Sequence, residues 1–420
     1  MLAMLKSAAI LALAALAIIL TVQLWLVHIP NRAFFPYMQA RFMAAAPPDE
    51  VAEFLRPLRV ISGVGDGYFD IDYSAQAAAM FWEFGRPALE TAMRQGAFHE
   101  LDGAELAEII SDGPVLIFEY AFPMDLTLFP QFFGQRSATP LNPPGMTHFT
   151  RVIIRPDAAN FSVTFVCDRY IWQYFFPPHL MPAVLLELEI PDPGYRRFVF
   201  NAGSQSFYPR FDINFTYHPV IISNPYQNPS GLLHLSFIAG RVEHFFNNPA
   251  TINRGLSGGV YTFGNLNTVV RYLPSDVIEY TSFRTITRAA TDFMTDFSVA
   301  HAFVAADPNV RNDFFLAGYE RRGRENVFWF DYIVGNFPLV SIENWYTGPH
   351  CQDPLRHPIE VVVDHGRVVR YRKIAYVFGV DLSTTVGLAL PAEAVRAGFP
   401  VRSTLNTAQH LLLQCLEHTP

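Results

Sequence analysis

The sequence predicts an α+β protein with an N-terminal transmembrane helix, followed by an ectodomain of several domains in which antiparallel sheets pack with helices. Three observations lead to this class. An uncharged apolar run extends from Ser7 to Val27. Later segments are rich in β-branched and aromatic residues and are punctuated by Gly and Pro, as strands and turns are. A few helical patterns, among them Thr287 to Phe303 and Leu405 to Glu417, accompany these strand-like runs.

The apolar run has the length of a membrane span. A helix over Ser7 to Val27 would be roughly 31 Å long at 1.5 Å per residue, which matches the hydrocarbon core of a bilayer. Trp25 and His28 stand at its far end, and Pro30 ends it. A cleaved signal peptide is the alternative, but the first small-residue cleavage pattern, Ala44 to Ala46, lies well beyond the run. We therefore expect an uncleaved single-span anchor.

The orientation of this anchor follows from the short segment before it. Lys6 on one flank and Arg32 and Arg41 on the other nearly balance, so the positive-inside rule does not decide. A short N-terminal segment before a long apolar run is typical of a signal-anchor, which leaves the rest of the chain outside the cell. The sequence predicts a single-pass protein of the cell membrane with an extracellular ectodomain.

Composition limits the partners of this ectodomain. The net charge of −8 argues against nucleic acid, which requires basic patches. Aromatic residues make up 15% of the chain and charged residues only 16%. Such a surplus indicates thick sheet cores or an exposed patch that meets a partner. Cys167, Cys351 and Cys415 are widely spaced and odd in number, so buried free thiols are expected rather than a disulfide framework.

The chain divides into four parts. Residues 1–46 hold a cytoplasmic stub, the anchor and a linker, residues 47–188 an N-terminal α+β domain, residues 189–282 a strand-rich middle domain, and residues 283–420 a C-terminal α+β domain.

In the N-terminal domain, helices are predicted over Ala75–Phe84, Pro87–Gln95 and Gly103–Ile110, and strands over Val115–Phe122, Phe149–Pro156 and Asn160–Phe176. In the C-terminal domain, the helix from Thr287 is capped by Thr285 or Thr287, and strands are predicted over Asn326–Val340 and the hairpin Ile359–Phe378.

Three short patterns were weighed as sites of chemistry. Asp70 and Asp72 would share one face of a strand as paired carboxylates, or Asp72 would cap a following helix. Ser257 occupies the nucleophile position of G-x-S-x-G, but a strand-like run follows it instead of a helix, which favours a Gly-rich hairpin turn. GVGDG, residues 63–67, lacks the helix that a phosphate-binding loop requires and is interpreted as a turn.

A fourth pattern is the densest group of possible metal ligands, His350, Cys351, Asp353 and His357. Zinc sites combine such a pair with a matching second pair, and none follows beyond His365. A polar loop is the favoured interpretation. We expect no metal, no cofactor and no catalytic residues, so the chain is not predicted to be an enzyme.

Two passages, Val242 to Ser282 and Phe330 to Phe378, share a pattern with a known family. The pattern is FFNNP, a Tyr-Thr hairpin, a VVRY…EY strand pair, a GNFP strand and an IEV…GRVVRYR hairpin. With the anchor ending LTVQLWLVHIPN, this resembles the YycH family of Gram-positive bacteria. The resemblance implies a membrane-anchored extracellular regulator that works with a YycI-like anchored protein on a WalK- or YycG-type sensor histidine kinase of a two-component system controlling the cell wall.

The resemblance also implies contact through transmembrane helices. Small residues let helix backbones approach closely in lipid, and Gln23 adds a polar group that bonds across helices. The expected partner-contact residues of the anchor are Ala8, Ala12, Ala15, Ala17, Thr21 and Gln23.

Two other functions stay open. An extracellular module that binds cell-wall polymer would use exposed aromatic rings such as Tyr170, Trp172 and Trp345 as stacking platforms. An anchored cell-wall hydrolase would use Asp70 and Asp72, Ser257, or a metal at His350 and His357 in a polar cleft.

Overall fold

The computed structural model describes Phe54 and residues 56–72, 81–95, 98–128, 145–155, 161–167, 170–176, 198–203, 205–209, 215–217, 220–228, 230–283, 291–334, 337–338, 355–380 and 386–388. Within these residues, no helix is long and apolar enough to cross a membrane. The expected anchor, Ser7 to Val27, lies outside them, as does the helix expected over Leu405 to Glu417.

The first half of the described chain forms an antiparallel sheet. Its strands lie in the order β3-β7-β6-β5-β4-β1-β2-β8-β9. Their bounds are β1 Arg59–Val64, β2 Tyr68–Asp72, β3 Phe98–Leu101, β4 Pro114–Asp125, β5 His148–Arg155, β6 Ser162–Val166, β7 Ile171–Phe175, β8 Phe198–Asn201 and β9 Ser206–Pro209. We call this sheet, with helices α5 (Arg86–Gln95) and α6 (Gly103–Ser111), the N-lobe.

Both faces of the N-lobe sheet are buried, which explains the unbroken apolar run of its central strand. Along β4, Leu116 and Phe118 join the core that also contains α5 side chains, whereas Val115 and Ile117 join the core against α6. A strand covered on both sides cannot alternate between apolar and polar residues. The helices predicted over Pro87–Gln95 and Gly103–Ile110 are confirmed as α5 and α6. A π-helical turn, Phe81–Gly85, precedes α5, and a 3-10 turn, Leu126–Leu128, follows β4.

The second half forms another antiparallel sheet, in the order β12-β13-β14-β15-β20-β19-β17-β16 with β18 beside β17. Its bounds are β12 Asn253–Ser257, β13 Val260–Gly264, β14 Thr268–Tyr272, β15 Val277–Ser282, β16 Asp313–Arg322, β17 Glu325–Val334, β18 Phe337–Pro338, β19 Ile359–Asp364 and β20 Val368–Ile374. This sheet, with helices α9 (Leu235–Val242) and α10 (Phe293–Ala306), is the C-lobe. Two 3-10 turns, Glu243–Phe245 and Pro249–Thr251, follow α9.

The principal helix of the C-lobe begins later than the sequence predicts. Asp292 caps α10, because its carboxylate accepts a 2.8 Å hydrogen bond from the Thr295 amide, so neither Thr285 nor Thr287 is the cap. Farther along α10, the buried Asp296 accepts a 2.8 Å bond from the Gly366 amide in the β19–β20 turn. That turn is the predicted Asp364-His365-Gly366 hairpin, with positive φ at His365 and Gly366.

The C-lobe sheet runs through the expected boundary at residues 282 and 283. β15, from the expected middle domain, pairs with β20, from the expected C-terminal domain, over Val277–Thr281. In the same way, β8 and β9 extend the N-lobe sheet although they lie beyond residue 188. Each of the two large sheets among the described residues thus combines strands from segments that the sequence assigns to different domains, and this pairing satisfies backbone groups that would otherwise lie at sheet edges.

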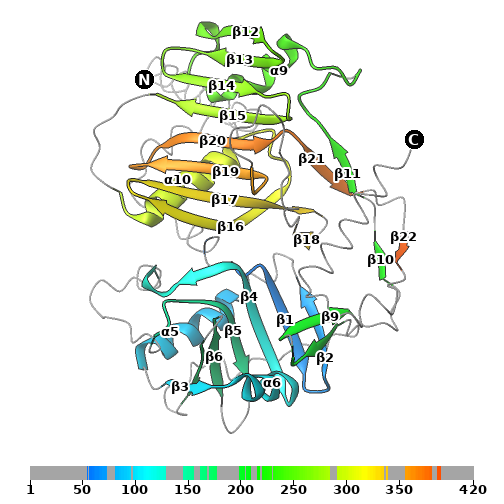
Figure 1. Cartoon of the computed structure of the whole chain (residues 1–420), viewed down its shortest axis with the longest axis vertical. Helices are drawn as coiled ribbons and strands as arrows, with labels where there is room; N and C mark the ends of the chain where they lie inside the picture. Colours follow the sequence, from blue (N-terminus) through cyan, green and yellow to red (C-terminus); the bar gives the residue numbers. More distant parts are fainter. Residues whose placement is uncertain are drawn as a thin grey trace, which may run out of the picture.

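The two lobes are stacked end to end, with β16 of the upper sheet nearest β4 of the lower one (Figure 1). One hydrophobic core contains side chains of both lobes. Two short antiparallel pairs run along one side, β10 (Phe215–Tyr217) with β22 (Val386–Leu388) and β11 (Val220–Ser223) with β21 (Val377–Val380). The observed class is α+β, antiparallel sheets packed with helices, as the sequence predicts for the ectodomain.

The start of α6 allows a direct test of the local structure. The Asp102 carboxylate accepts from the Ala104 and Glu105 amides, at 2.8 and 2.9 Å, and Glu105 accepts from the Asp102 amide at 2.8 Å. Asp102→Ala removes two of these bonds, and we expect a loss of about 1 kcal/mol of stability. Glu108→Ala, on the exposed side of the same helix, is the control. Equal urea midpoints for the two variants would contradict the capping role.

Candidate interaction surface

The residues expected to contact partners through the anchor lie outside the described residues, so their prediction stays untested. The same holds for Trp345, His350, Cys351, Asp353 and Cys415. Cys167 is described, and it is a buried free thiol.

Ser257 lies where a hairpin turns. It is the last residue of β12, and Gly258 and Gly259 follow with φ of 58° and 79° before β13 begins. Two successive positive φ values make a tight two-residue hairpin, so the predicted turn is confirmed and the serine does not stand on a strand-to-helix elbow. Asp70 and Asp72 both lie in β2, opposite Ser62 and Val60 of β1.

Two of the three aromatic residues expected to stack on a polymer, Tyr170 and Trp172, lie among the described residues. Trp172 is 9% exposed and belongs to the core of the N-lobe. Tyr170 is half-buried, and its ring lies close to Gly145. Stacking on a sugar requires an exposed ring face, which the buried Trp172 does not offer.

Instead, the C-lobe sheet carries a row of charged side chains that its register creates. Arg271 of β14 lies opposite Glu279 of β15, Glu279 opposite Arg372 of β20, and Arg372 opposite Glu360 of β19. Trp329 of β17 then lies opposite Glu360 and completes the row. We call these five residues the charge row. Directly opposite residues on neighbouring strands share one face of a sheet, so opposite charges alternate across four strands.

Two ion pairs and one hydrogen bond lie within the charge row. The guanidinium of Arg271 lies 3.6 Å from the carboxylate of Glu279, and that of Arg372 lies 3.7 Å from Glu360. The indole N–H of Trp329 donates to Glu360 at 3.1 Å. The Arg271 side chain is 51% exposed, whereas that of Arg372 is 6% exposed. The row thus runs from a solvent-exposed end at β14 to a buried centre.

Neighbouring residues extend the row at its centre and its tryptophan end. Arg370, 35% exposed, makes a second ion pair with Glu360 at 3.2 Å. His357 stacks on Trp329 and bonds to Asp331 at 2.9 Å. Burial raises the pKa of Asp331, and His357 partly offsets that effect. Among the former metal candidates, the described His357 is therefore a partner of a buried carboxyl.

Gly318 of β16 makes room for the tryptophan. It lies opposite Trp329, and a Cβ at this position would approach the indole to 3.2 Å. The strand also shifts register between Leu316 and Gly318. A larger residue would have to displace the ring that closes the charge row.

All members of the charge row except Trp329 lie inside the two passages singled out in the sequence, Val242 to Ser282 and Phe330 to Phe378. Arg271 is the arginine of VVRY, Glu360 the glutamate of IEV, and Arg372 the last arginine of GRVVRYR. Sequence reasoning treated these motifs as hairpins and missed that they form one surface. The sequence does place one charged residue of this row in each of four strands, which was the available signal. Which strands become neighbours, above all β15 and β20, is decided by the tertiary structure.

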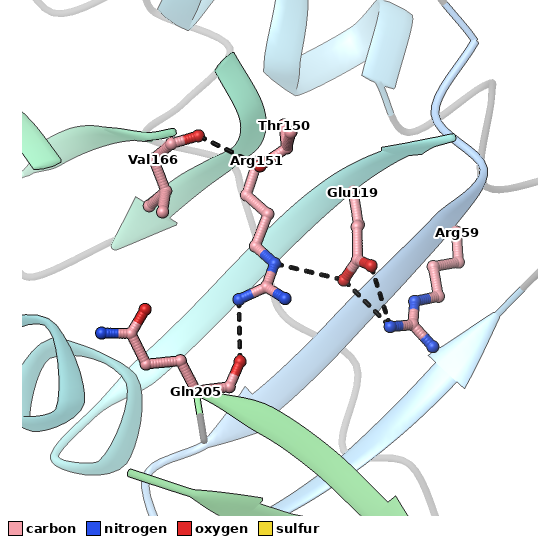
Figure 2. A network of polar contacts seen from close by, with 6 residues as sticks. All are labelled: Arg59, Glu119, Thr150, Arg151, Val166 and Gln205. Atoms are coloured by element: carbon pink, nitrogen blue, oxygen red, sulfur yellow. Dashed lines mark hydrogen bonds and ion pairs between the residues drawn. The ribbon is translucent and has the colours of Figure 1, made fainter. Parts of the chain in front are cut away.

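A shorter row lies on the N-lobe (Figure 2). Arg59, Glu119 and Arg151 stand opposite one another on β1, β4 and β5. Arg59 donates to both carboxylate oxygens of Glu119 at 3.0 Å, and Arg151 lies 3.4 Å from the same carboxylate. Arg151 also donates to the carbonyl oxygen of Gln205 at 2.9 Å, which fixes the β8–β9 turn on the sheet.

The other face of the C-lobe sheet holds a fully buried ion pair. The Lys373 ammonium lies 2.9 Å from the Asp307 carboxylate, and the two side chains are 1% and 0% exposed. The carboxylate also accepts from the Tyr371 hydroxyl at 3.0 Å and the Asn309 amide at 2.9 Å, and His244 lies 3.4 Å away. These contacts join the end of α10 to β20 and to the turn after α9.

Burial and neighbouring charges act in opposite directions on the pKa of each group in this buried pair. Burial alone would raise the pKa of Asp307, but Lys373 and His244 outweigh it and lower the pKa. Burial lowers the pKa of Lys373 more than Asp307 raises it, and burial likewise lowers the pKa of His244. Asp307 therefore releases its proton more readily in the folded state than in the unfolded chain. Its contribution to stability is complete above the ordinary carboxyl pKa and is lost as the pH falls through the lower folded value.

Comparison with known proteins gives one finding. No family model matches the chain, and no curated protein is significantly similar to it. Among solved structures, the chain is similar to the crystal structure of YycH from Bacillus subtilis, with 8% sequence identity and a TM-score of 0.43, over 80% of this chain and 84% of that one. A likeness at this level assigns neither family nor function.

The buried pair yields a pH-dependent prediction. Lys373→Met leaves the Asp307 carboxylate buried without its cation, and we expect a loss of about 3–5 kcal/mol at neutral pH. The pKa of Asp307 should rise in this variant, because burial then acts without the Lys373 cation. The loss of stability that Asp307 contributes on acidification should therefore shrink or reverse, so the stability difference between the two chains should narrow as the pH falls. Urea unfolding across acid to neutral pH measures both effects. Parallel pH profiles for the two chains would contradict the assignment.

Proposed function

We propose that this protein is a membrane-anchored extracytoplasmic regulator that modulates a cell-wall-controlling sensor histidine kinase through protein contacts. In this proposal it acts together with a YycI-like anchored protein, with its ectodomain outside the cell. The apolar run Ser7 to Val27 supports the anchor, and the passages Val242 to Ser282 and Phe330 to Phe378 support the family resemblance.

One observation carries the proposal: the motifs behind the resemblance supply the charge row. Two sequence-distant passages come together on adjacent strands, β15 and β20, and align Arg271, Glu279, Arg372 and Glu360 on one face. Arginine and aromatic side chains are enriched at protein interfaces, and complementary charges give such contacts specificity and speed. A row that is exposed at Arg271 and buried at Arg372 suits recognition by a polar protein surface at its β14 end.

The alternative functions receive less support from the geometry. Polymer binding by stacking on Trp172 would require its ring at the surface, and that side chain is in the core. Hydrolysis by Ser257 would require an elbow, and that residue ends a strand at a two-residue hairpin.

The exposed end of the charge row can be tested against a matched control. Arg271→Glu reverses a charge that is 51% exposed and paired with Glu279. We expect at least a tenfold loss of kinase crosslinked to the full chain in native membranes, with unchanged expression. Arg254→Glu is the control. Arg254 lies on β12, is 42% exposed and pairs with Glu243. Its register places it on the other face of the sheet from the charge row. Equal crosslinking by both variants would remove the row from the proposal.

The anchor has a separate test. The proposal places partner contacts at Ala8, Ala12, Ala15, Ala17, Thr21 and Gln23, where small residues permit close helix packing. Exchanging Ser7 to Val27 for a poly-leucine span of equal length should keep the protein in the membrane but uncouple it from the kinase, measured with a reporter of the kinase's target genes. A chimera that regulates as well as the native chain would place all contact in the ectodomain.

A further inference from the structure

The first described residue of the chain lies at the junction of the two lobes. Phe54 is 1% exposed. Its ring centroid lies 5.0 Å from that of Phe297 and 5.6 Å from that of Phe293, both on α10. It also lies 5.9 Å from Tyr319 on β16 and 6.2 Å from Phe122 on β4. One side chain thus contacts a strand of the N-lobe and two elements of the C-lobe.

The rings around Phe54 form a site suited to an aromatic side chain. Phe293, Phe297 and Phe122 meet Phe54 edge to face, at interplanar angles of 82°, 76° and 66°. Such arrangements are the favoured geometry of aromatic pairs. Phe122 and Tyr319 also contact each other across the lobes, at 5.4 Å and 86°. We call Phe122, Phe293, Phe297 and Tyr319 the ring site.

Tyr319 is held in this position by more than ring packing. Burial and the nearby Asp125 raise its pKa to about 12, and a hydrogen bond with the Asp125 backbone accompanies this contact. Arg321, two residues later, places its guanidinium 4.7 Å from the ring centroid of Phe293. Contacts from both lobes therefore hold the residues of the ring site independently of Phe54.

The residues after Phe54 attach the same segment to the N-lobe. The amide of Leu58 donates to the Glu119 carbonyl oxygen at 2.8 Å. Arg59 follows with its two 3.0 Å contacts to the Glu119 carboxylate (Figure 2). The chain is thus held at the junction by Phe54 and on the N-lobe sheet by Leu58 and Arg59. This segment follows the expected anchor and linker directly in the sequence.

We infer that the ring site is an intramolecular docking site for the membrane-proximal segment, with Phe54 as its ligand, and that its occupancy holds the two lobes in one arrangement. A movement of the segment before Phe54 that withdrew this ring would then change the contacts of both lobes together. The docking of Phe54 does not depend on regulation of a kinase, whereas the position of the segment next to the membrane rests on the anchor of the proposed function.

Phe54→Ala tests the inference in the full chain, purified in detergent. Spin labels are placed on the N-lobe by Glu108→Cys and on the C-lobe by Arg324→Cys, in a background carrying Cys167→Ala, Cys351→Ala and Cys415→Ala. The distance between the labels is measured by pulsed electron resonance. The native residue should give one narrow distribution. Phe54→Ala should give a broad one and split a single thermal unfolding transition into two.

Phe69→Ala is the matched control. Phe69 is also 1% exposed, but its ring contacts are with Phe200 and Phe207 inside the N-lobe. This variant should lower the unfolding temperature and leave the distance distribution narrow. Benzene, which enters apolar cavities of this kind, should narrow the distribution of Phe54→Ala again.

Two results with the alanine variants would overturn the inference. One is a narrow distribution for Phe54→Ala, which would make Phe54 an ordinary core residue. The other is equal broadening in Phe69→Ala, which would show that any loss of core packing separates the lobes. If Phe54→Ala does not fold, Phe54→Leu replaces it, because leucine keeps the site apolar but loses the edge-to-face contacts. A folded Phe54→Leu chain with a narrow distribution would likewise overturn it.

Discussion

Antiparallel register is the constraint on which the rest of this structure depends. Because residues directly opposite on neighbouring strands share a face, one pairing of β15 with β20 places Glu279 beside Arg372 and so builds the charge row. A shift of that pairing by one residue would turn Arg372 toward the α10 side and Lys373 away from Asp307. The charge row and the buried ion pair thus lie on opposite faces of the sheet and depend on the same register. Each favours this register over one shifted by a residue.

Aromatic side chains join the two large sheets in one hydrophobic core. The high phenylalanine content serves a core that extends through both lobes, with α10 as its centre in the C-lobe. Rings from β4, β16 and α10 meet edge to face at the junction, and the segment before β1 contributes Phe54 to the same contacts. Large rigid rings bury much area at little cost in side-chain entropy, which suits a junction between two sheets.

For a membrane-anchored regulator, these features would have complementary roles. Under the proposed function, the charge row would offer a polar surface to a partner at its β14 end, and the junction would connect the two lobes to the segment that follows the expected anchor. Contact made in the membrane and contact made by the ectodomain would then act on the same rigid body. The N-lobe row of Arg59, Glu119 and Arg151 belongs to the second role, since Arg59 holds that segment on β4.

The sequence by itself determined the local elements and the class. Caps, turns and strand runs such as Asp102, Gly258-Gly259 and Val115 to Phe122 carry their signals in adjacent residues, so α6, the β12–β13 hairpin and β4 were predictable. Only the tertiary structure decided that β15 pairs with β20, that β8 and β9 extend the first sheet, and that Phe54 joins the lobes. These pairings join residues far apart in the chain, and their choice depends on the total burial and backbone pairing of the folded protein, which no local pattern encodes.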